Sequence, residues 1–290
     1  MTHPIVVGVD GSPSALQAVR WASEEAVRRG LPLRLVNAHA TPIGLPGGVA
    51  DPVVVEKALR KQGKHWLHEA RRIVHDVSGD LRPDLLLMTA SVVPALVDES
   101  LNASLLVLGT RGLGGFTGLL IGSTAVSLAG RAHCPLVVVR GDEPVHGPVV
   151  VGVDGTTTSE DAVAFAFAEA SVHGADLVAV HAWADTVLDT VLLGRSEPPD
   201  FEPAQQRAYE TLGERLAGWQ EKYPEVRVVR EVVRDHPSRA LLRHAGGARL
   251  VVVGTRGRGD LQGLVLGSTG QHLLHHAPCP VAVVRTEPDS

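Results

Sequence analysis

The chain has 290 residues, so two domains of ordinary length are expected rather than one. Hydrophobic residues make up 44% of the sequence and charged residues 20%, a profile that is typical of a globular protein with full cores. The formal net charge is −5, which excludes a basic field over the whole chain that would attract nucleic acid or an anionic membrane. We find no signal-peptide pattern and no apolar stretch with the length of a bilayer, so we expect a cytoplasmic protein.

The first half alternates short apolar runs with helical patterns. Strands are expected at 5–10, 33–38, 85–88, 105–108 and 136–139, and helices at 14–29, 93–100 and 122–132. After a loop rich in proline and glycine at 41–52, a long helix is expected to bury one stripe, formed by Val55, Leu59, Gln62, Trp66, Ala70 and Ile73.

The second half repeats this order. Its strands are expected at 149–154, 177–182, 226–233, 250–253 and 281–284, and its long helix carries a core stripe formed by Leu212, Leu216, Trp219 and Tyr223. Short apolar strands that alternate with helices indicate parallel βαβ units with right-handed crossovers. The predicted fold class is therefore α/β, with two tandem open, doubly wound parallel five-stranded sheets, strand order 3-2-1-4-5 and helices on both faces.

Several segments occur twice at a nearly constant spacing, which indicates a duplicated domain. Near copies of 5–11, 109–112 and 122–124 reappear at 149–155, 254–257 and 267–269. We predict one domain at 1–143, a second at 148–290, and a short linker at 141–148 that is rich in glycine, proline and acids. Cys134 and Cys279 each precede a proline at equivalent positions, and we expect them to be reduced, packed thiols.

The carboxyl ends of the strands carry the most informative residues. Asp10 and Asp154 close the first strands, and Gly109 and Gly254 close the fourth strands. In the strand order 3-2-1-4-5, these two strands are neighbours at the point where the order reverses, which is where doubly wound sheets bind ligands. We therefore expect one pocket in each domain that receives both loops.

Glycine-rich loops follow the fourth strands, at 109–124 and 254–269. Glycines leave no Cβ between backbone amides and an anion, and each loop ends where a helix begins, so N–H groups, hydroxyls and the positive end of the helix dipole converge. One such loop could be a mobile turn, but two copies favour binding of a nucleotide's phosphates. The candidate contacts are Gly109, Arg111, Gly112, Gly115, Gly122, Ser123 and Thr124, and Gly254, Arg256, Gly257, Gly259, Gly267, Ser268 and Thr269.

The remaining candidate contacts lie at the ends of the first and second strands: Gly8, Asp10, Ala38, Gly152, Asp154 and Ala182. The aspartates would repel phosphates, so they are expected to face ribose hydroxyls or a donor on the base. The glycines let a ligand lie close to the strand backbone, and the alanines offer main-chain groups to the base. The two loop arginines are as typical of a solvated loop as of a phosphate contact.

These motifs resemble the ATP-binding branch of the universal stress protein family, whose signature is Gly-x2-Gly-x9-Gly-Ser/Thr. Both halves match it, at Gly109, Gly112, Gly122 and Ser123 and at Gly254, Gly257, Gly267 and Ser268. The first-strand aspartates match the family's adenine-contacting acid, and the tandem arrangement is similar to that of two-domain actinobacterial members. The resemblance covers nearly the whole chain. It implies one ATP per domain, with or without Mg²⁺, dimer formation, and roles in stress response and growth control.

The two halves differ in some of these positions. Asn37 stands where the second half has His181, which is nearer the family pattern, so one contact is expected more firmly in the second site than in the first. In the glycine loops, Leu113 and Phe116 contrast with Arg258 and Asp260. The two loops are therefore not required to bind with equal affinity.

Two other functions stay open. One is a slow ATP hydrolase or phosphotransfer enzyme, but neither half has a Gly-x4-Gly-Lys-Ser/Thr loop and neither glycine loop contains lysine, so we expect at most slow hydrolysis. The other is a nucleotide-free dimeric interaction protein. The terminal strands at 136–139 and 281–284 are natural pairing surfaces, either with each other or in a homodimer.

A cluster of histidines suggests a metal site as a further alternative. His272, His275 and His276 lie near Cys279, with spacings that can place two imidazoles on one face of a helix. The first half has nothing equivalent, and the chain contains 14 histidines. We therefore predict a solvated helix surface and no metal site.

Overall fold

The computed structural model describes residues 2–40, 51–112, 121–141, 146–183, 202–256 and 266–285. The chain forms two compact units, Met1–Asp142 and Glu143–Ser290. The elements of the first unit are β1 (Ile5–Gly8), α1 (Pro13–Arg29), β2 (Leu33–His39), α2 (Pro52–Val77), β3 (Asp84–Thr89), α3 (Val92–Ser100), β4 (Leu105–Gly109), α4 (Ser123–Ala129) and β5 (Leu136–Val139).

The second unit repeats this order, with a short 3-10 turn η1 (Thr157–Ser159) before its first helix. Its elements are β6 (Val149–Gly152), α5 (Glu160–His173), β7 (Leu177–Ala182), α7 (Glu202–Lys222), β8 (Val228–Val233), α8 (Pro237–Ala245), β9 (Leu250–Gly254), α9 (Ser268–His276) and β10 (Val281–Val284).

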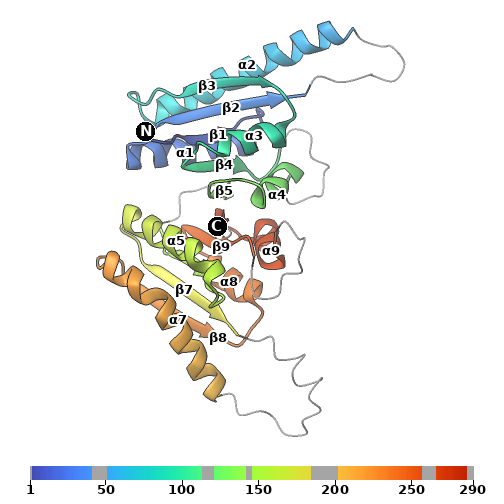
Figure 1. Cartoon of the computed structure of the whole chain (residues 1–290). Helices are drawn as coiled ribbons and strands as arrows, with labels where there is room; N and C mark the ends of the chain where they lie inside the picture. The colour runs from blue at the N-terminus through green and yellow to red at the C-terminus, as the bar shows by residue number, and fades with distance from the viewer. Residues whose placement is uncertain are drawn as a thin grey trace, which may run out of the picture. The chain divides into compact units, whose positions relative to one another are not determined.

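Each unit contains a parallel sheet with helices on both faces (Figure 1). The strand order is β3-β2-β1-β4-β5 in the first unit and β8-β7-β6-β9-β10 in the second. Val7 is paired with Leu35 on one side and Val107 on the other, and Val151 is paired in the same way with Ala179 and Val252. In the first unit α1 packs against α2 and α3 against α4, as α5 does against α7 and α8 against α9 in the second. The predicted fold class and strand order are confirmed.

The central strands are apolar throughout because helices cover both of their faces. Ile5, Val6 and Val7 of β1 are each 0% exposed. Burying one side chain of this size contributes about 1.5–3 kcal/mol to folding, so β1 and its neighbours form the core of the first unit. The equivalent β6 is buried in the same way.

Local signals fix the ends of α1. Ser12 caps its N-terminus by accepting a hydrogen bond from the Ala15 amide, and Pro13 occupies the first turn. Gly30 ends the helix with a φ of 63°, a left-handed conformation that glycine adopts without strain. In the second unit Gly174 ends α5 in the same conformation. The Ser12 cap therefore places the start of α1 directly after the loop that leaves β1, and the two glycines end α1 and α5.

Several predicted details were wrong. α2 buries Gly63, Leu67, Ala70 and Val74, whereas Gln62 of the predicted stripe is exposed. The buried face is set by the close approach of α2 to β2, where a Cβ on Gly63 would lie 2.4 Å from Asn37 Oδ1. α4 ends at Ala129 because Gly130 caps it, so it is shorter than the predicted helix at 122–132.

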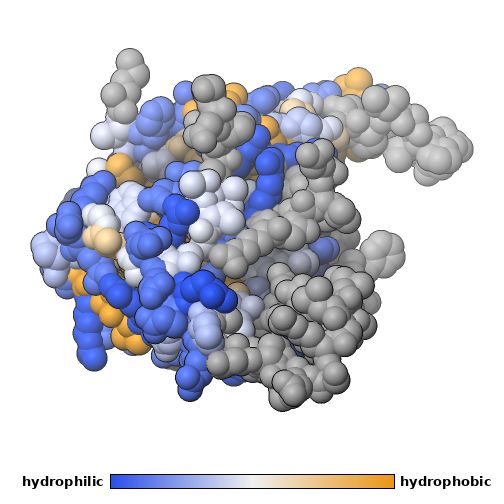
Figure 2. Space-filling view, turned by 60° about the horizontal axis from the view of Figure 1, so that its bottom comes forward, coloured by the Kyte–Doolittle hydropathy of each residue, from blue (hydrophilic) through white to orange (hydrophobic). Residues whose placement is uncertain are grey.

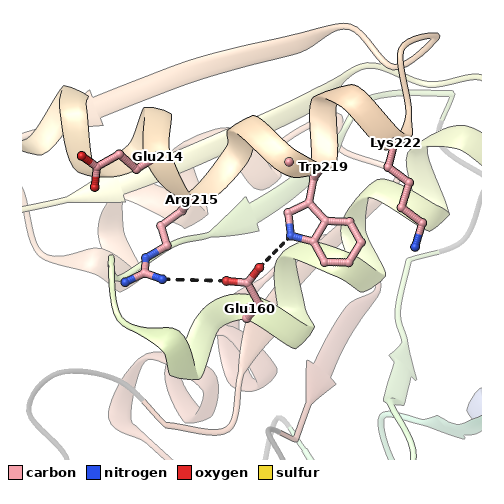
Figure 3. A pocket seen from close by; sticks show the side chains of 6 residues that line it. Glu160, Glu214, Arg215, Trp219 and Lys222 are labelled. Carbon is pink, nitrogen blue, oxygen red and sulfur yellow. Dashed lines mark hydrogen bonds and ion pairs between the residues drawn. The ribbon is translucent and has the colours of Figure 1, made fainter.

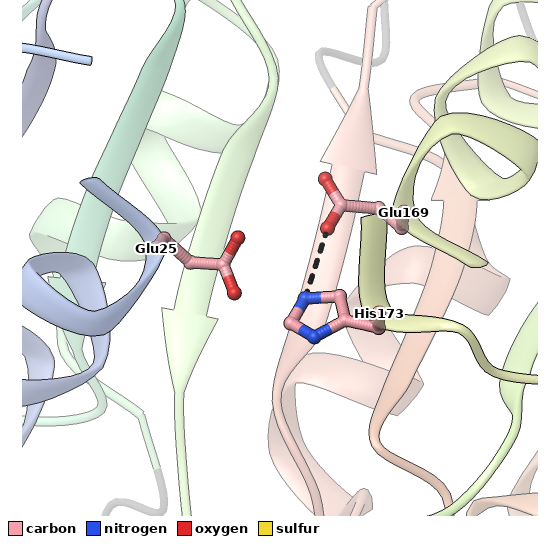
Figure 4. Close-up of side chains that lie close together, drawn as sticks. All are labelled: Glu25, Glu169 and His173. Carbon is pink, nitrogen blue, oxygen red and sulfur yellow. Dashed lines mark ion pairs between the residues drawn. The ribbon is translucent and has the colours of Figure 1, made fainter. Parts of the chain in front are cut away.

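Two buried glutamates occupy equivalent positions in α1 and α5 (Figure 4). Glu25 is 2% exposed and accepts a hydrogen bond of 2.9 Å from Arg29 Nε, one turn further along α1. Glu169 is 0% exposed, and its carboxylate lies 3.7 Å from His173 Nε2, one turn further along α5. Each buried carboxylate therefore has a basic partner on its own helix, as a buried charge requires.

The described residues that are visible in Figure 2 are mostly hydrophilic, with hydrophobic residues in small separate patches. Among the described residues, no helix is both long enough and apolar enough to cross a membrane.

Candidate functional site

A cavity of about 250 Å³ opens at the carboxyl edge of the second sheet. The ends of β6, β7 and β9 and the first residues of α8 and α9 line it, so it lies at the predicted switch point. Eight of the candidate contacts line this cavity: Gly152, Asp154, Ala182, Gly254, Arg256, Gly267, Ser268 and Thr269. Gly257 and Gly259 lie outside the described residues.

The first sheet has a cavity of about 150 Å³ at the same place. The candidate contacts that line it are Gly8, Asp10, Ala38, Gly109, Arg111, Gly112, Gly122 and Thr124. Ser123 is not among the lining residues, and Gly115 lies outside the described residues, as do Leu113 and Phe116 and the second-half positions Arg258 and Asp260. The structure thus brings together loops that are about a hundred residues apart in sequence.

The first-strand aspartates shape the loops that follow them. Asp10 Oδ1 accepts hydrogen bonds from the Ser12 amide at 3.0 Å and the Ser12 hydroxyl at 2.6 Å. Asp154 Oδ1 accepts the equivalent bonds from the Thr156 amide at 2.8 Å and its hydroxyl at 2.7 Å. Each carboxylate therefore holds a tight turn through its Oδ1 oxygen, a role that the sequence analysis missed.

In the first unit, the same turn anchors the beginning of the glycine loop. The Ser12 hydroxyl lies 2.9 Å from the Arg111 carbonyl oxygen, and the Arg111 amide donates to the Ser14 hydroxyl at 3.2 Å. A Cβ on Gly112 would lie 2.4 Å from Asp10 Oδ2, which explains why glycine is needed there. The carboxylate and the loop backbone are thus held in van der Waals contact.

In each domain a main-chain hydrogen bond joins the two ends of the glycine loop just before the last helix. The Gly122 amide donates to the Thr110 carbonyl at 2.7 Å, and the Gly267 amide donates to the Thr255 carbonyl at 2.8 Å. Gly122 and Gly267 are also the N-cap residues of α4 and α9, where no side-chain cap is made. The first amides of these helices are therefore left to water or a ligand, and in α9 they border the cavity.

Asn37 and His181 are different residues at equivalent positions, and they make equivalent hydrogen bonds. Asn37 Nδ2 donates to the Val9 carbonyl at 2.7 Å, and His181 Nδ1 lies 2.6 Å from the Val153 carbonyl, so that its ring N–H donates. Both side chains are buried, and both fix the residue that precedes the aspartate. This part of the first site is therefore built like the second, which was not expected from the sequence.

The side chains that line the two cavities differ more than the main-chain contacts around them. Leu108 lines the first cavity where the smaller Val253 lines the second, and Val92 begins α3 where Pro237 begins α8. Trp183 and His236 line only the second cavity. The sequence analysis missed these residues, although the strand order places the start of α3 and α8 at the same edge as the glycine loops.

A larger hollow of about 390 Å³ lies between α5 and α7 (Figure 3). Three of its polar groups contact one another: Trp219 Nε1 donates to Glu160 at 3.0 Å, and Arg215 lies 3.9 Å from the same carboxylate. Arg215 also donates to the Gly155 carbonyl at 3.1 Å. Because these contacts tie α7 to α5 and to the loop after β6, we assign the hollow a structural role and keep the cavities at the carboxyl edge as the candidate site.

Comparison with known proteins agrees with this architecture. A model of the universal stress protein family matches residues 1–140 and 146–285. A universal stress protein of Mycobacterium tuberculosis is 42% identical over 291 residues, which cover 97% of this chain and 96% of that protein.

A solved structure that matches the whole chain gives the same result for the fold. The crystal structure of a universal stress protein from Archaeoglobus fulgidus matches with a TM-score of 0.70 at 17% identity, covering 99% of this chain and 98% of that chain. A universal stress protein crystallised in complex with cAMP matches 48% of this chain and 97% of its own, with a TM-score of 0.38 and 25% identity.

Proposed function

This chain belongs to the universal stress protein family, with one domain of that family in each half, and we propose that each domain binds one ATP molecule and that the protein is a nucleotide-dependent regulator of stress response and growth. The observation that carries the proposal is the pair of cavities at the switch points. Each is bounded by an aspartate, a glycine loop and the start of a helix.

The lining chemistry fits a nucleotide part by part. In the second cavity, the uncapped start of α9 with Ser268 and Thr269 offers amides and hydroxyls to phosphate oxygens. The Asp154 carboxylate lies at the end of β6, where a ribose hydroxyl or a base donor can reach its oxygens. Ala182 and Val253 leave apolar space beside the strand ends for the flat base.

The same lining argues against rapid catalysis. Among the described residues that line either cavity there is no lysine to bind a terminal phosphate. In Asp10 and Asp154 the Oδ1 oxygen is committed to hydrogen bonds within the turn, so it does not serve to orient an attacking water. We therefore propose binding with at most slow hydrolysis, with or without Mg²⁺, and we infer a cytoplasmic setting for this role.

Calorimetric titration of the nucleotide-free full chain with ATP tests this proposal. We expect two ATP per chain, and Gly122→Glu and Gly267→Glu should each remove one site by placing a carboxylate beside the phosphates. A Cβ on Gly122 would have only an ordinary contact, 3.5 Å from the Thr110 carbonyl oxygen, so the fold should tolerate this change.

Matched controls exist in both domains. Gly79→Glu and Gly246→Glu add the same charge at exposed glycines and should leave both sites intact, because a Cβ on Gly246 would meet open space and one on Gly79 only an ordinary contact, 3.7 Å from the His75 ring. Absence of ATP binding would favour a nucleotide-free interaction protein, and prompt turnover would favour an enzyme. Whether the terminal strands pair within the chain or in a homodimer stays a prediction, which light scattering at several concentrations tests.

A further inference from the structure

The outer face of α2 carries a stripe of basic side chains. At roughly 100° per residue, side chains at intervals of three, four or seven residues share one face of a helix. The residues that α2 buries, Gly63, Leu67, Ala70 and Val74, lie on another face. All members of the basic stripe are exposed: Lys57, Lys61, Lys64, His68, Arg71 and Arg72.

No acid lies within the basic stripe. Glu56, Glu69 and Asp76 are the acids of α2, and each projects roughly 100° to one side of the stripe. An ion pair of 4.0 Å joins Glu56 to Arg60, which lies outside the stripe. Among the described residues, no hydrogen bond or ion pair holds a lysine of the stripe. These positive charges are therefore open to a partner from outside the chain.

The equivalent helix of the second domain, α7, carries acids on its outer face. Glu210, Glu214 and Glu221 are exposed, and their intervals of four and seven residues place them on one side of the helix, opposite its buried leucines. Gln206 donates a hydrogen bond of 3.0 Å to Glu210, and within the described parts of the chain no ion pair neutralises this acidic stripe. Since α7 occupies the same place in the fold, the fold itself does not require the cations of α2.

The two halves of the chain differ in charge in the same sense. Residues 1–142 contain 14 Arg and Lys and 12 Asp and Glu, whereas residues 143–290 contain 13 and 20. A nucleic acid or an anionic membrane would be repelled by these excess acids, because the whole chain has a net charge of −5. A second copy of the chain has no such difficulty, since its second half supplies the opposite charge.

We propose that the basic stripe of α2 docks against the acidic stripe of α7 in a second copy of this chain. Intervals of four and seven residues also separate Lys57, Lys61 and His68, so side chains of the two stripes can meet in pairs. At 1.5 Å per residue, the acidic stripe is about 17 Å long and the basic stripe about 23 Å, so the acids can all find partners. Exposed ion pairs are individually weak, and the association is therefore weak and sensitive to salt.

Sedimentation of the nucleotide-free full chain tests the proposal at about 0.01 M and about 1 M salt, where charges are screened beyond about 30 Å and 3 Å. At low salt the average mass should rise with protein concentration, and at high salt this rise should be lost. The α2 variant Lys57→Glu/Lys61→Glu/Lys64→Glu should associate at least about tenfold more weakly at low salt, because its glutamates face the acidic stripe. All three positions are exposed, so the variant should keep the circular dichroism spectrum of the parent.

A second variant identifies the occupant. The α7 variant Glu210→Lys/Glu214→Lys/Glu221→Lys should also lose the low-salt association, because its lysines face the basic stripe. An equal mixture of the α2 and α7 variants should associate again, since the new glutamates of one chain match the new lysines of the other and the unchanged stripes match as well. Neither a nucleic acid nor an unrelated protein would produce this recovery.

The control variant Arg20→Glu/Arg227→Glu/Arg239→Glu changes the net charge by the same amount at exposed positions outside both stripes, and it should associate like the parent. Several results would overturn the proposal: a parent mass that does not depend on salt, parental association in the α2 or α7 variant, an equal loss in the control, or no recovery in the mixture. Pairing through the apolar terminal strands would survive high salt and is thereby distinguished.

The outcome is independent of the ATP proposal. No residue of α2 or α7 is among the described residues that line the two cavities at the carboxyl edges, and no nucleotide is present during sedimentation. Failure of the docking contact therefore leaves ATP binding untouched, and the α2 and α7 variants should still bind ATP like the parent.

Discussion

Gly109 and Gly254 end the fourth strand of each domain, yet the structure predicts opposite outcomes for their replacement by alanine. A Cβ on Gly109 would lie 2.4 Å from the main-chain carbonyl carbon and oxygen of Ser14 and 2.7 Å from the Ala15 amide nitrogen. A Cβ on Gly254 would meet its nearest atoms, both carbonyl oxygens, at 3.4 Å, which is ordinary contact.

The size of the stability loss depends on which atoms the new Cβ would overlap. Main-chain atoms cannot rotate away, so Gly109→Ala must displace the start of α1 from β4 by roughly 1 Å, and overpacking of this kind costs about 1–3 kcal/mol. Gly254→Ala needs no displacement, and we expect a change within about 0.5 kcal/mol. For a domain of this size the loss corresponds to a melting temperature about 2–4 °C lower per kcal/mol.

Hydrogen exchange of the full chain, followed by mass spectrometry of peptides, assigns the loss to a domain. In Gly109→Ala, amides of β1 and β4 should exchange about 5-fold to more than 100-fold faster than in the parent, while β6 and β9 keep their protection. Gly254→Ala is the matched control and should change neither domain. Unchanged exchange in Gly109→Ala, or equal acceleration by the two variants, would refute the reasoning from main-chain contact.

Three further predictions concern single contacts. His181→Ala should lower the free energy of unfolding by about 1–3 kcal/mol, because the Val153 carbonyl loses its donor. His181→Asn should restore most of this stability in urea denaturation, since Asn37 makes the same bond in the first domain, and equal losses in the two variants would contradict this. Burial raises the pKa of Cys134 to about 12, so its thiol should stay neutral and unreactive toward a disulfide reagent at pH 8 until urea is added. Rapid labelling of Cys134 in the native chain would count against this. Gly112→Ala should weaken ATP binding at the first site at least about tenfold and leave the second site unchanged, because the new Cβ would overlap with Asp10 Oδ2. Calorimetry that still finds two equal sites would exclude this effect.

The fold was predictable because its signals are local and repeated. Each strand is a short apolar run, and each helix has its own periodicity. Because 5–11 recurs at 149–155, the elements predicted in one half support those predicted in the other. Right-handed crossovers then limit the possible strand orders, and the order 3-2-1-4-5 brings Asp10 and Gly109 to one edge. The candidate site could be located from the sequence for this reason.

The parts that escaped prediction depend on contacts between elements. The buried face of α2 is set by β2 through Gly63 and Asn37, and not by the helix's own apolar stripe. The turn role of Asp10 depends on the hydroxyl two residues later, and His236 lines the second cavity only because the start of α8 lies at the same sheet edge as the start of α9. Periodicity along one element carries no information about which neighbour it meets.

The comparison of the two domains separates backbone chemistry from side-chain chemistry. The turns at Asp10 and Asp154 and the loop closures at Gly122 and Gly267 are the same, because backbone geometry leaves few alternatives once glycine is required. Side chains on the walls have no such constraint, and there Leu108 contrasts with Val253. If each domain binds ATP as proposed, phosphate recognition by main-chain amides should be shared by both sites, while affinity for the base should differ between them.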